Sequence, residues 1–328
     1  MRVAVLGTGS WGTALAILLA RNGHDVDLLG RSVEEVQSID ARRENLRYLP
    51  GFALPRNVSA GMLGEATEVD LAVVAVPSAA IREIVTQLPP GNPRVVVASK
   101  GLEPHTGGFM VDVVKEARPA SAVGVLSGPN LAIEIARGVP TVALSAFDRR
   151  SDAEAVQNAF TCATFRVSVT EDVVGVELAG ALKNVLAIGG GMSDGLGFGD
   201  NTKGAFLSRG LMEVARLGTA MGARTETFLG PAGVGDLFAT ANSRLSRNYR
   251  VGEALGKGMN LTEALAVVGQ VAEGVPTSEA AQILARKYEV ELPVLAAVEG
   301  VLRGRISPRQ AVAMLMDRAP RMDGFLGS

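Results

Sequence analysis

Cysteine, histidine and aromatic residues are scarce in this chain of 328 residues, which has one Cys, two His and 4% aromatics. The lone Cys162 excludes an internal disulfide and a cysteine metal cluster, and it fits a reducing compartment. His24 and His105 fall in a turn and a polar loop, which disfavours a histidine general acid. The chain has no HExxH, no GxSxG and no cluster of metal ligands. We therefore expect no metal site, and acid–base chemistry would have to use lysine, tyrosine or a carboxylate.

Strong charge and long apolar runs are also missing. The formal net charge is −2 and the basic residues are scattered, so we expect no nucleic-acid partner. The apolar run from Ala14 stops at Arg21, and the chain begins with a strand pattern where a signal peptide would have an apolar core. We expect a cytoplasmic protein with no stable membrane insertion. Hydrophobic residues make up 47% of a chain about twice the usual domain length, which predicts two domains.

The first 32 residues predict a strand, a tight glycine turn, a helix and a second strand. Val3 to Leu6 is a short apolar run typical of a buried parallel strand. The sequence GTGSWG follows at once, and Ala14 to Arg21 is a run of good helix formers that ends at Asn22-Gly23. Val26 to Leu29 is the second strand. This context distinguishes the motif from an isolated GxGxxG, which is weak by itself.

The three glycines of this turn have separate roles. Gly7 allows the sharp turn out of the strand, Gly9 lets a pyrophosphate approach the backbone, and Gly12 lets the helix pack against the sheet. The following helix then presents N–H groups and a partial positive charge to phosphates. We predict a dinucleotide site here; a purely structural turn is the alternative.

The end of the second strand indicates which dinucleotide is used. NAD-binding domains often place an Asp or Glu there for the ribose, but this chain has Arg31 after Gly30. Asp25 and Asp27 come too early in the strand. A cation suits a 2′-phosphate, so NADP is the preferred cofactor and NAD the second. The alternative is that Arg31 is a solvated loop residue or stacks on the adenine.

Strands alternate with helices up to about Thr170, and helices alone follow. The further predicted strands are 70–76, 95–99, 122–126 and 141–145. This pattern predicts an α/β protein with an N-terminal doubly wound Rossmann-type sheet followed by an all-helical C-terminal domain. We expect a dinucleotide-binding domain over 1–170 and a substrate domain over 171–328. Ligands bind beyond the carboxyl ends of such strands, where 77–78, 100–101 and 128–130 fall.

The segments expected to be helical are 33–47, 81–88, 174–188, 205–221, 250–255, 261–268, 278–287 and 293–303. Between two of them, residues 189–204 hold seven glycines. We predict a loop there, either close to a ligand or a mobile connection.

Lys183 is the strongest candidate for acid–base chemistry. It lies inside an otherwise apolar helix, in ELAGALKNVLAI, where an ammonium is costly unless it has partners or faces a polar cleft. Desolvation favours the neutral amine and so produces a usable general base near neutral pH. The alternative is a lysine whose stem lies along the helix while its amine reaches water.

Two polar segments follow in the helical domain. Asp236 ends the glycine-rich GPAGVGD and precedes an apolar helix, so it could be an N-cap. Ser246, Arg247 and Asn248 together offer a hydroxyl, a guanidinium and an amide, which suits a phosphate; a solvated loop is the alternative.

These motifs resemble bacterial NAD(P)-dependent sn-glycerol-3-phosphate dehydrogenases across nearly the whole chain. The matching segments are GTGSWGTALA, NLRYLPG, VPS, SKGLE, LSGPNLAIE, ELAGALKNVLAI, GLGFGDNTKGAF, GPAGVGDLFATANSRLSRN and GQVAEGVPT. The resemblance implies reduction of dihydroxyacetone phosphate to sn-glycerol 3-phosphate for phospholipid synthesis. The family often has Ser or Thr where this chain has Asn130, and Ala where it has Gly204.

The resemblance also implies residue roles. Lys183 would be the proton donor and acceptor, with Lys100 and Asp236 as its active-site partners. Substrate positions would be Lys100, Gly128, Asn130, Lys183, Asp236, Ser246, Arg247 and Asn248. Cofactor positions would be Gly7, Gly9, Ser10, Trp11, Gly12, Arg31, Tyr48, Lys100, Ala132, Arg247, Val271 and Glu273.

Other hypotheses stay open at this point. One is a two-domain dehydrogenase of the ketopantoate reductase or 3-hydroxyacid dehydrogenase type, in which Ser246 to Asn248 would bind a carboxylate. Another is a non-catalytic NADP(H) sensor, which would need neither Lys100 nor Lys183. The sequence also leaves the oligomeric state open, a homodimer included.

Overall fold

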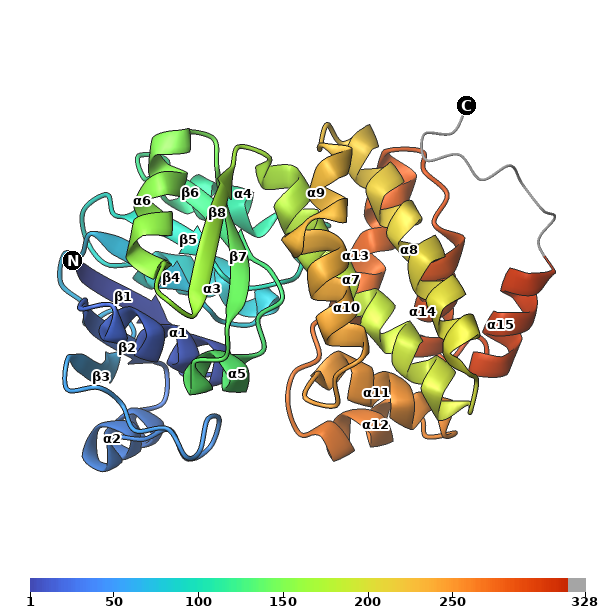
Figure 1. Cartoon of the computed structure of the whole chain (residues 1–328), viewed down its shortest axis with the longest axis horizontal. Coiled ribbons are helices and arrows are strands. Elements are labelled where there is room, and N and C mark those ends of the chain that lie inside the picture. The colour runs from blue at the N-terminus through green and yellow to red at the C-terminus, as the bar shows by residue number, and fades with distance from the viewer. Residues whose placement is uncertain (318–328) are drawn as a thin grey trace. The chain divides into compact units, whose positions relative to one another are not determined.

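The computed structural model describes residues 1–317 and divides the chain into two compact units (Figure 1). The N-terminal unit comprises Met1–Ser99 and Met110–Val173. The helical unit comprises Lys100–Phe109 and the chain from Val174 onward. The expected division at 170/171 placed residues 100–109 in the first domain, whereas they pack with the second. Residues 318–328, the end of the expected second domain, lie outside the described part.

The N-terminal unit is built on one sheet of eight strands in the order β3-β2-β1-β4-β5-β6-β7-β8. Their bounds are β1 Arg2–Leu6, β2 Asp25–Gly30, β3 Val58–Met62, β4 Leu71–Val74, β5 Arg94–Val97, β6 Val123–Ser127, β7 Thr141–Phe147 and β8 Phe165–Thr170. The central strands β1 and β4 are almost wholly buried. This burial on both faces explains why they read as continuous apolar runs.

Helices lie on both faces of this sheet (Figure 1). Their bounds are α1 Ser10–Arg21, α2 Val33–Arg42, α3 Ile81–Ile84, α4 Met110–Ala117, α5 Ala132–Arg137 and α6 Arg150–Phe160. Helices α1, α5 and α6 share one apolar core with the strands. The predicted helix over 33–47 ends early, at Arg42, because Arg43 adopts a left-handed conformation with φ of 52°. The rest of that segment is a loop beside the glycine turn.

One strand pair departs from the expected parallel sheet. β7 runs antiparallel to β6, whereas the other pairs are parallel. The helix between them, α5, has six residues and spans only about 9 Å. It is too short for the crossover that a parallel return requires, so β7 starts at the end of the sheet where β6 stops. Gly128 to Asn130 lie in this connection, at the carboxyl end of β6.

The helical unit is all-helical over the residues described. Its helices are α7 Val173–Gly195, α8 Asp200–Ala220, α9 Thr225–Leu229, α10 Asp236–Ala241, α11 Arg247–Gly256, α12 Leu261–Val268, α13 Gly274–Lys287, α14 Pro293–Leu302 and α15 Pro308–Met316. A single apolar core centres on α7, whose Leu182, Val185 and Leu186 are fully buried. α7 is also long and apolar enough to cross a membrane, but it is almost entirely buried inside the protein, as the central helix of a core is.

The prediction of a loop over 189–204 was wrong for most of the segment, and only residues 196–199 lie outside helices. α7 continues to Gly195 and α8 begins at Asp200. Two of these glycines serve close packing against α11: a Cβ at Gly191 would lie 2.1 Å from the carbonyl oxygen of Tyr249, and one at Gly195 would lie 2.3 Å from that of Glu253. Glycine therefore occurs here because α7 and α11 touch backbone to backbone, and the core packing offsets its low helix propensity.

Candidate active site

The glycine turn of the N-terminal unit has the form its sequence predicts. Gly7 has φ of +121°, which disfavours any other residue, and a Cβ at Gly12 would lie 1.9 Å from the carbonyl oxygen of Gly7. A Cβ at Gly9 would meet nothing within 4 Å. α1 starts here without a side-chain cap. The turn therefore leaves open space above Gly9 at a helix N-terminus, which fits the pyrophosphate of a dinucleotide.

Four other predicted cofactor residues of this unit lie on α1, directly after β2 or in the loop after α2. Ser10 opens α1, and Trp11 donates from Nε1 to the carbonyl oxygen of Ala98 at 2.9 Å, which ties α1 to the end of β5. Arg31 is exposed directly after β2. Tyr48 is half-buried in the loop after α2, with the Arg47 guanidinium 5.0 Å from its ring centre.

Three charged side chains meet inside the helical unit. Lys183 of α7 donates to Oδ1 of Asp236 at 2.9 Å, and Lys100 donates to Oδ2 of the same carboxylate at 2.7 Å. Lys183 and Asp236 are buried, with side chains 8% and 2% exposed. Asp236 is the first residue of α10, but its carboxylate joins two ammonium groups instead of acting as an N-cap. One carboxylate thus holds two lysines from segments far apart in the sequence.

Burial and charge set the protonation of this group. Desolvation lowers the pKa of Lys183 to about 8, even though the Asp236 carboxylate opposes the shift. For Asp236, burial would raise the pKa, but the two ammonium groups outweigh burial and hold it below its ordinary value. The carboxylate is therefore ionised at neutral pH, and Lys183 gains or loses a proton within about a unit of neutrality.

Two further residues hold Lys183 and Lys100 in place. Lys183 donates to Oγ1 of Thr240 at 2.6 Å, and that hydroxyl donates to Oδ1 of Asp236 at 3.1 Å. Asn184 donates to the carbonyl oxygen of Lys100 at 2.9 Å. Sequence analysis did not single out Thr240. The spacing from Asp236 to Thr240 on a helix, which puts both on one face, is the signal that could have found it.

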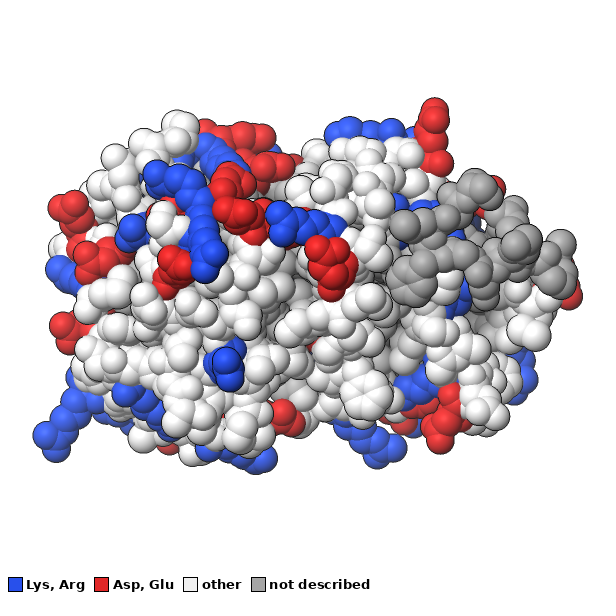
Figure 2. All heavy atoms as spheres, turned by 45° about the horizontal axis from the view of Figure 1, so that its top comes forward, with Lys and Arg blue, Asp and Glu red and all other residues white. Residues whose placement is uncertain are grey.

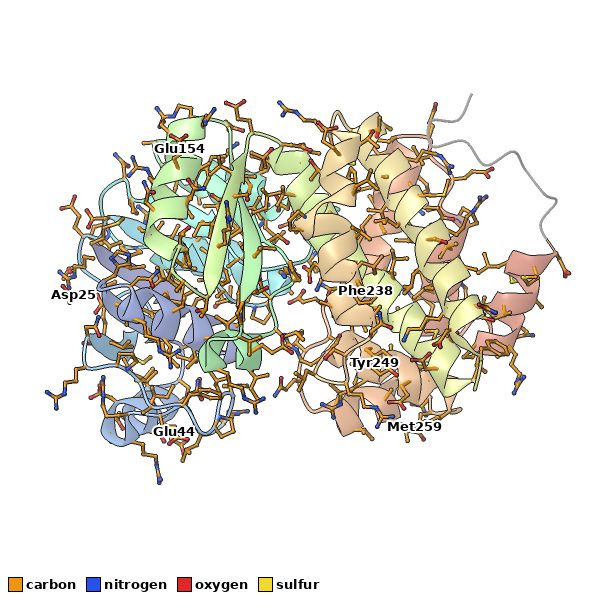
Figure 3. All side chains as sticks on the ribbon, in the orientation of Figure 1. Asp25, Glu44, Glu154, Phe238, Tyr249 and Met259 are labelled. Atoms are coloured by element: carbon orange, nitrogen blue, oxygen red, sulfur yellow. The ribbon has the colours of Figure 1, made fainter. Side chains whose placement is uncertain are left out.

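A short π-helical turn, Pro231–Gly235, directly precedes Asp236 and helps to orient it toward the two lysines. A Cβ at Gly233 would lie 2.0 Å from the carbonyl oxygen of Phe228, so this turn also packs backbone to backbone. Single π turns occur often at functional sites, where they re-aim one side chain. In Figure 3, Phe238 marks α10, the helix that follows, and its side chain is exposed.

The cluster of Ser246, Arg247 and Asn248 proves to be the start of α11. Ser246 is its N-cap and accepts from the backbone N–H of Tyr249, which Figure 3 labels on this helix. Asn248 is buried, donates to Oδ1 of Asn184 at 2.8 Å and accepts from the backbone N–H of Gly274 at 2.9 Å. Its amide therefore links α11 to α7 and α13, beside the lysine that precedes Asn184.

Arg247 differs from Ser246 and Asn248 in that its main described partner is a charged group, the carboxylate of Glu273. Desolvation lowers the pKa of its guanidinium, and the nearby carboxylate of Glu273 opposes the shift. Its positive charge also contributes to the low pKa of Lys183. Glu273 precedes α13, and Val271, just before it, is 49% exposed.

The remaining predicted substrate and cofactor residues belong to the N-terminal unit. Gly128 is a site where a Cβ would lie 2.8 Å from the carbonyl oxygen of Val142. Asn130 donates to that same oxygen at 3.0 Å. Ala132 is the first residue of α5. Gly128, Asn130 and Ala132 thus belong to the N-terminal unit. Lys100 and Lys183, which both contact Asp236, belong to the helical unit.

Neither surface charge nor clustered metal ligands indicate a further site in the part of the chain that the structure describes. On the face shown in Figure 2, acidic and basic side chains are interspersed, with no broad field of one sign among the residues described. Within residues 1–317 no three His, Cys, Asp or Glu side chains come together as a metal site.

A dinucleotide-type glycine turn in one unit and a buried lysine–carboxylate cluster in the other define a two-unit nicotinamide-dependent dehydrogenase. Comparison with family models identifies which family of dehydrogenases this is. The N-terminal model of the NAD-dependent glycerol-3-phosphate dehydrogenases matches residues 2–153, and the C-terminal model matches residues 172–313. The chain belongs to this family.

Individual relatives agree with the family models. The glycerol-3-phosphate dehydrogenase (NAD(P)+) of Desulfitobacterium hafniense is 45% identical over 325 residues, covering 98% of this chain and 92% of the relative. The crystal structure of glycerol-3-phosphate dehydrogenase from Coxiella burnetii is 37% identical, with a TM-score of 0.92 over 97% of this chain and 99% of that one. A 2-dehydropantoate 2-reductase from Methylococcus capsulatus, at 16% identity and a TM-score of 0.58 over 97% of this chain and 99% of that one, shares the fold alone.

Proposed function

We infer that this chain is an oxidoreductase that reduces dihydroxyacetone phosphate to sn-glycerol 3-phosphate with a hydride from NADPH or NADH. Family membership and the activity for which its relatives are named support the reaction. The observation that carries the residue assignment is the buried Lys183 ammonium, fixed by Asp236 in an otherwise apolar helix.

Lys183 is the proton donor in this proposal. Two of its three ammonium hydrogens are engaged by Asp236 and Thr240, which leaves the third for the substrate's carbonyl oxygen. A nicotinamide dinucleotide held at the glycine turn would supply the hydride for the ketone carbon. As negative charge develops on the oxygen, Lys183 gives it a proton and becomes a neutral amine. In the reverse direction the neutral amine takes the hydroxyl proton, and a pKa of about 8 suits both directions.

Lys100 and Asp236 prepare the site for that proton transfer. The Lys100 ammonium adds positive potential where the oxyanion develops, and it stays in place through its bond to Asp236. Asp236 balances part of the two positive charges, without which Lys183 would hold its proton even less well. We assign the substrate's phosphate to Ser246, Arg247 and Asn248 in the same unit, with Gly128 and Asn130 as further substrate positions.

The cofactor assignment rests on the N-terminal unit. We propose that Gly7, Gly9, Ser10, Trp11 and Gly12 hold the pyrophosphate, and that Arg31 favours NADPH by pairing with its 2′-phosphate. We also assign Tyr48, Lys100, Ala132, Arg247, Val271 and Glu273 to the cofactor, on the family resemblance.

The test is oxidation of NADPH and of NADH, followed by absorbance, with dihydroxyacetone phosphate as the only substrate. We expect turnover with both and a preference for NADPH. Lys183→Met should lower kcat by about 10³-fold, since it removes the general acid, while dinucleotide binding survives. Lys183→Arg, which keeps the charge but not the tunable pKa, should remain nearly inactive. Near-normal turnover in Lys183→Met would remove this residue from the mechanism.

The two other hypotheses make different predictions. A ketopantoate-type enzyme would turn over ketopantoate and ignore competing phosphate esters, whereas this proposal expects inhibition by glycerol phosphate analogues. A non-catalytic sensor would bind NADPH without turnover of any ketone. The buried Lys183–Asp236–Lys100 cluster argues against a sensor, because a binding protein has no use for a lysine held near its titration point.

We further propose that the enzyme works in the cytoplasm, supplies glycerophospholipid synthesis and forms a homodimer. A mass measured by light scattering tests the last point. A monomer at assay concentrations would contradict it without touching the catalytic assignment.

A further inference from the structure

The carboxylate of Glu35 touches the glycine turn of the N-terminal unit. Its Oε1 accepts a hydrogen bond from Oγ1 of Thr8, the residue between Gly7 and Gly9. Glu35 lies in the first turn of α2, where its backbone N–H donates to the N-cap Ser32. Its side chain is 16% exposed. An acidic group is therefore held against the motif that is expected to bind a dinucleotide.

This carboxylate lies where β2 ends. A Cβ at Gly30, the last residue of β2, would be 2.8 Å from Cγ2 of Thr8 and 2.9 Å from Cγ2 of Val36. The end of β2, the glycine turn and the start of α2 therefore converge on one point. In dinucleotide-binding sheets this point faces the adenosine ribose, where a carboxylate accepts from the 2′-hydroxyl and a cation pairs with a 2′-phosphate. The sequence pattern offered only acidic residues within β2, Asp25 and Asp27, whereas Glu35 comes from the next helix.

A cation faces the same carboxylate from the loop after α2. The Arg47 guanidinium lies 3.7 Å from Oε2 of Glu35 and over the ring of Tyr48. Asn45, which is buried, anchors this loop by donating to the carbonyl oxygen of Thr8 at 2.6 Å and to Oγ1 of Thr13 at 2.8 Å. Figure 3 labels the neighbouring Glu44 in the same loop, next to α2. Arg47 is thus held near the turn by its loop, while its own side chain remains exposed.

We propose that Glu35 and Arg47 set the choice between the two nicotinamide cofactors. Glu35 accepts from the ribose 2′-hydroxyl of NADH and repels the 2′-phosphate of NADPH. Arg47 offsets that repulsion and, with Arg31, supplies the positive charge that admits NADPH. The site therefore accepts both cofactors because it holds one group suited to each. This inference rests on the proposed function, since it assumes that the glycine turn binds NAD(P)H.

The first test replaces Glu35 with Gln, which keeps an acceptor for Thr8 and removes the charge. We expect the ratio of NADPH to NADH affinity, measured by fluorescence titration without substrate, to rise about tenfold. The ratio of kcat/KM values should rise in parallel. Glu34→Gln is the matched control, because it removes the same charge from the adjacent exposed position of α2. It should leave both ratios unchanged.

Arg47→Met should act in the opposite direction and weaken NADPH about fivefold relative to NADH. Arg42→Met, at the exposed end of α2, is its control. Equal weakening of both cofactors in Glu35→Gln, or unchanged ratios in both test variants, would overturn the proposal and leave Glu35 a structural residue of α2. Failure of the wild-type protein to bind either dinucleotide would instead overturn the proposed function.

Discussion

The candidate sites of the two units differ in the groups that form them. In the N-terminal unit the site is mostly backbone: a turn of six consecutive residues, open space above Gly9 and the start of α1. In the helical unit it is made of side chains, and its central ion pairs join residues 53 and 136 positions apart. A site made of backbone groups is encoded by one continuous stretch of sequence. A site made of side chains from distant segments forms only when the chain folds. The two should therefore respond differently to substitution.

The largest effect is expected for Asp236→Asn. This change leaves the buried Lys100 and Lys183 ammonium groups without a carboxylate, so we expect the free energy of unfolding to fall by about 3–5 kcal/mol. It also releases both lysines from their positions, so kcat should fall about 10³-fold. Urea denaturation and the dihydroxyacetone phosphate assay measure the two effects. The glycine turn is untouched, so dinucleotide binding should fall much less than kcat, by no more than the loss of Lys100 causes.

A double variant separates charge balance from catalysis. Asp236→Asn combined with Lys100→Met carries one fewer uncompensated charge, so it should recover part of the lost stability while remaining inactive. If the double variant were no more stable than the single one, the cluster would not be held by charge.

The glycine turn can be tested by two substitutions with opposite consequences. Gly12→Ala puts a Cβ 1.9 Å from a backbone oxygen, so we expect it to cost about 3 kcal/mol of stability. Gly9→Ala meets nothing within 4 Å and should leave the unfolding free energy within about 0.5 kcal/mol of the parent. Because its methyl group occupies the space for the pyrophosphate, Gly9→Ala should weaken dinucleotide binding at least about tenfold. Normal binding by a folded Gly9→Ala protein would contradict the assignment of this turn.

This contrast also explains what could be predicted from the sequence. The strand–turn–helix of residues 3–21 was predictable because its signals are contiguous, and the structure confirms its order. Lys183 stood out because an ammonium in an apolar helix is costly. Thr240 could have been found from its spacing to Asp236 on the same helix. The bonds that join Lys100 and Lys183 to Asp236 depend on which distant segments meet, and no local pattern encodes that.

The errors have the same origin. Residues 189–195 read as a loop because glycine disfavours helices locally, yet contact with the backbone of α11 requires glycine there. The antiparallel β7 was missed because the sequence shows a strand but not its direction. Glu35 was passed over because only the folded chain brings the start of α2 to the glycine turn.

A buried carboxylate away from the site should make stability depend on pH. Glu213 of α8 accepts from the backbone N–H groups of Val294 and Leu295 at the start of α14. Burial raises its pKa from 4.5 to about 7. Between these values the folded state binds more protons than the unfolded state, so stability falls as pH rises from about 4.5 to 7. The loss is about 3 kcal/mol.

Glu213→Gln removes this dependence. Its stability relative to the parent should rise by about 3 kcal/mol between pH 4 and pH 8, because only the parent loses stability over that range, as measured by urea denaturation. Glu226→Gln, an exposed position on α9, should show no such trend. Parallel pH curves for Glu213→Gln and the parent would mean that Glu213 titrates normally.

The smallest effect tests how finely the helical unit tunes its lysine. With the pKa of Lys183 at about 8, ketone reduction should fall above that pH, about tenfold per unit, while alcohol oxidation rises up to it. Thr240→Val removes an acceptor that favours the ammonium, so the pKa of Lys183 should drop further and both limbs should move to lower pH. We expect kcat at pH 7 to fall about fivefold. Thr277→Val is the control, because it removes another buried hydroxyl of the same unit that has no hydrogen-bond partner among the described residues. Limbs that stay at the parent's pH in Thr240→Val would mean that Thr240 does not contribute to the pKa of Lys183.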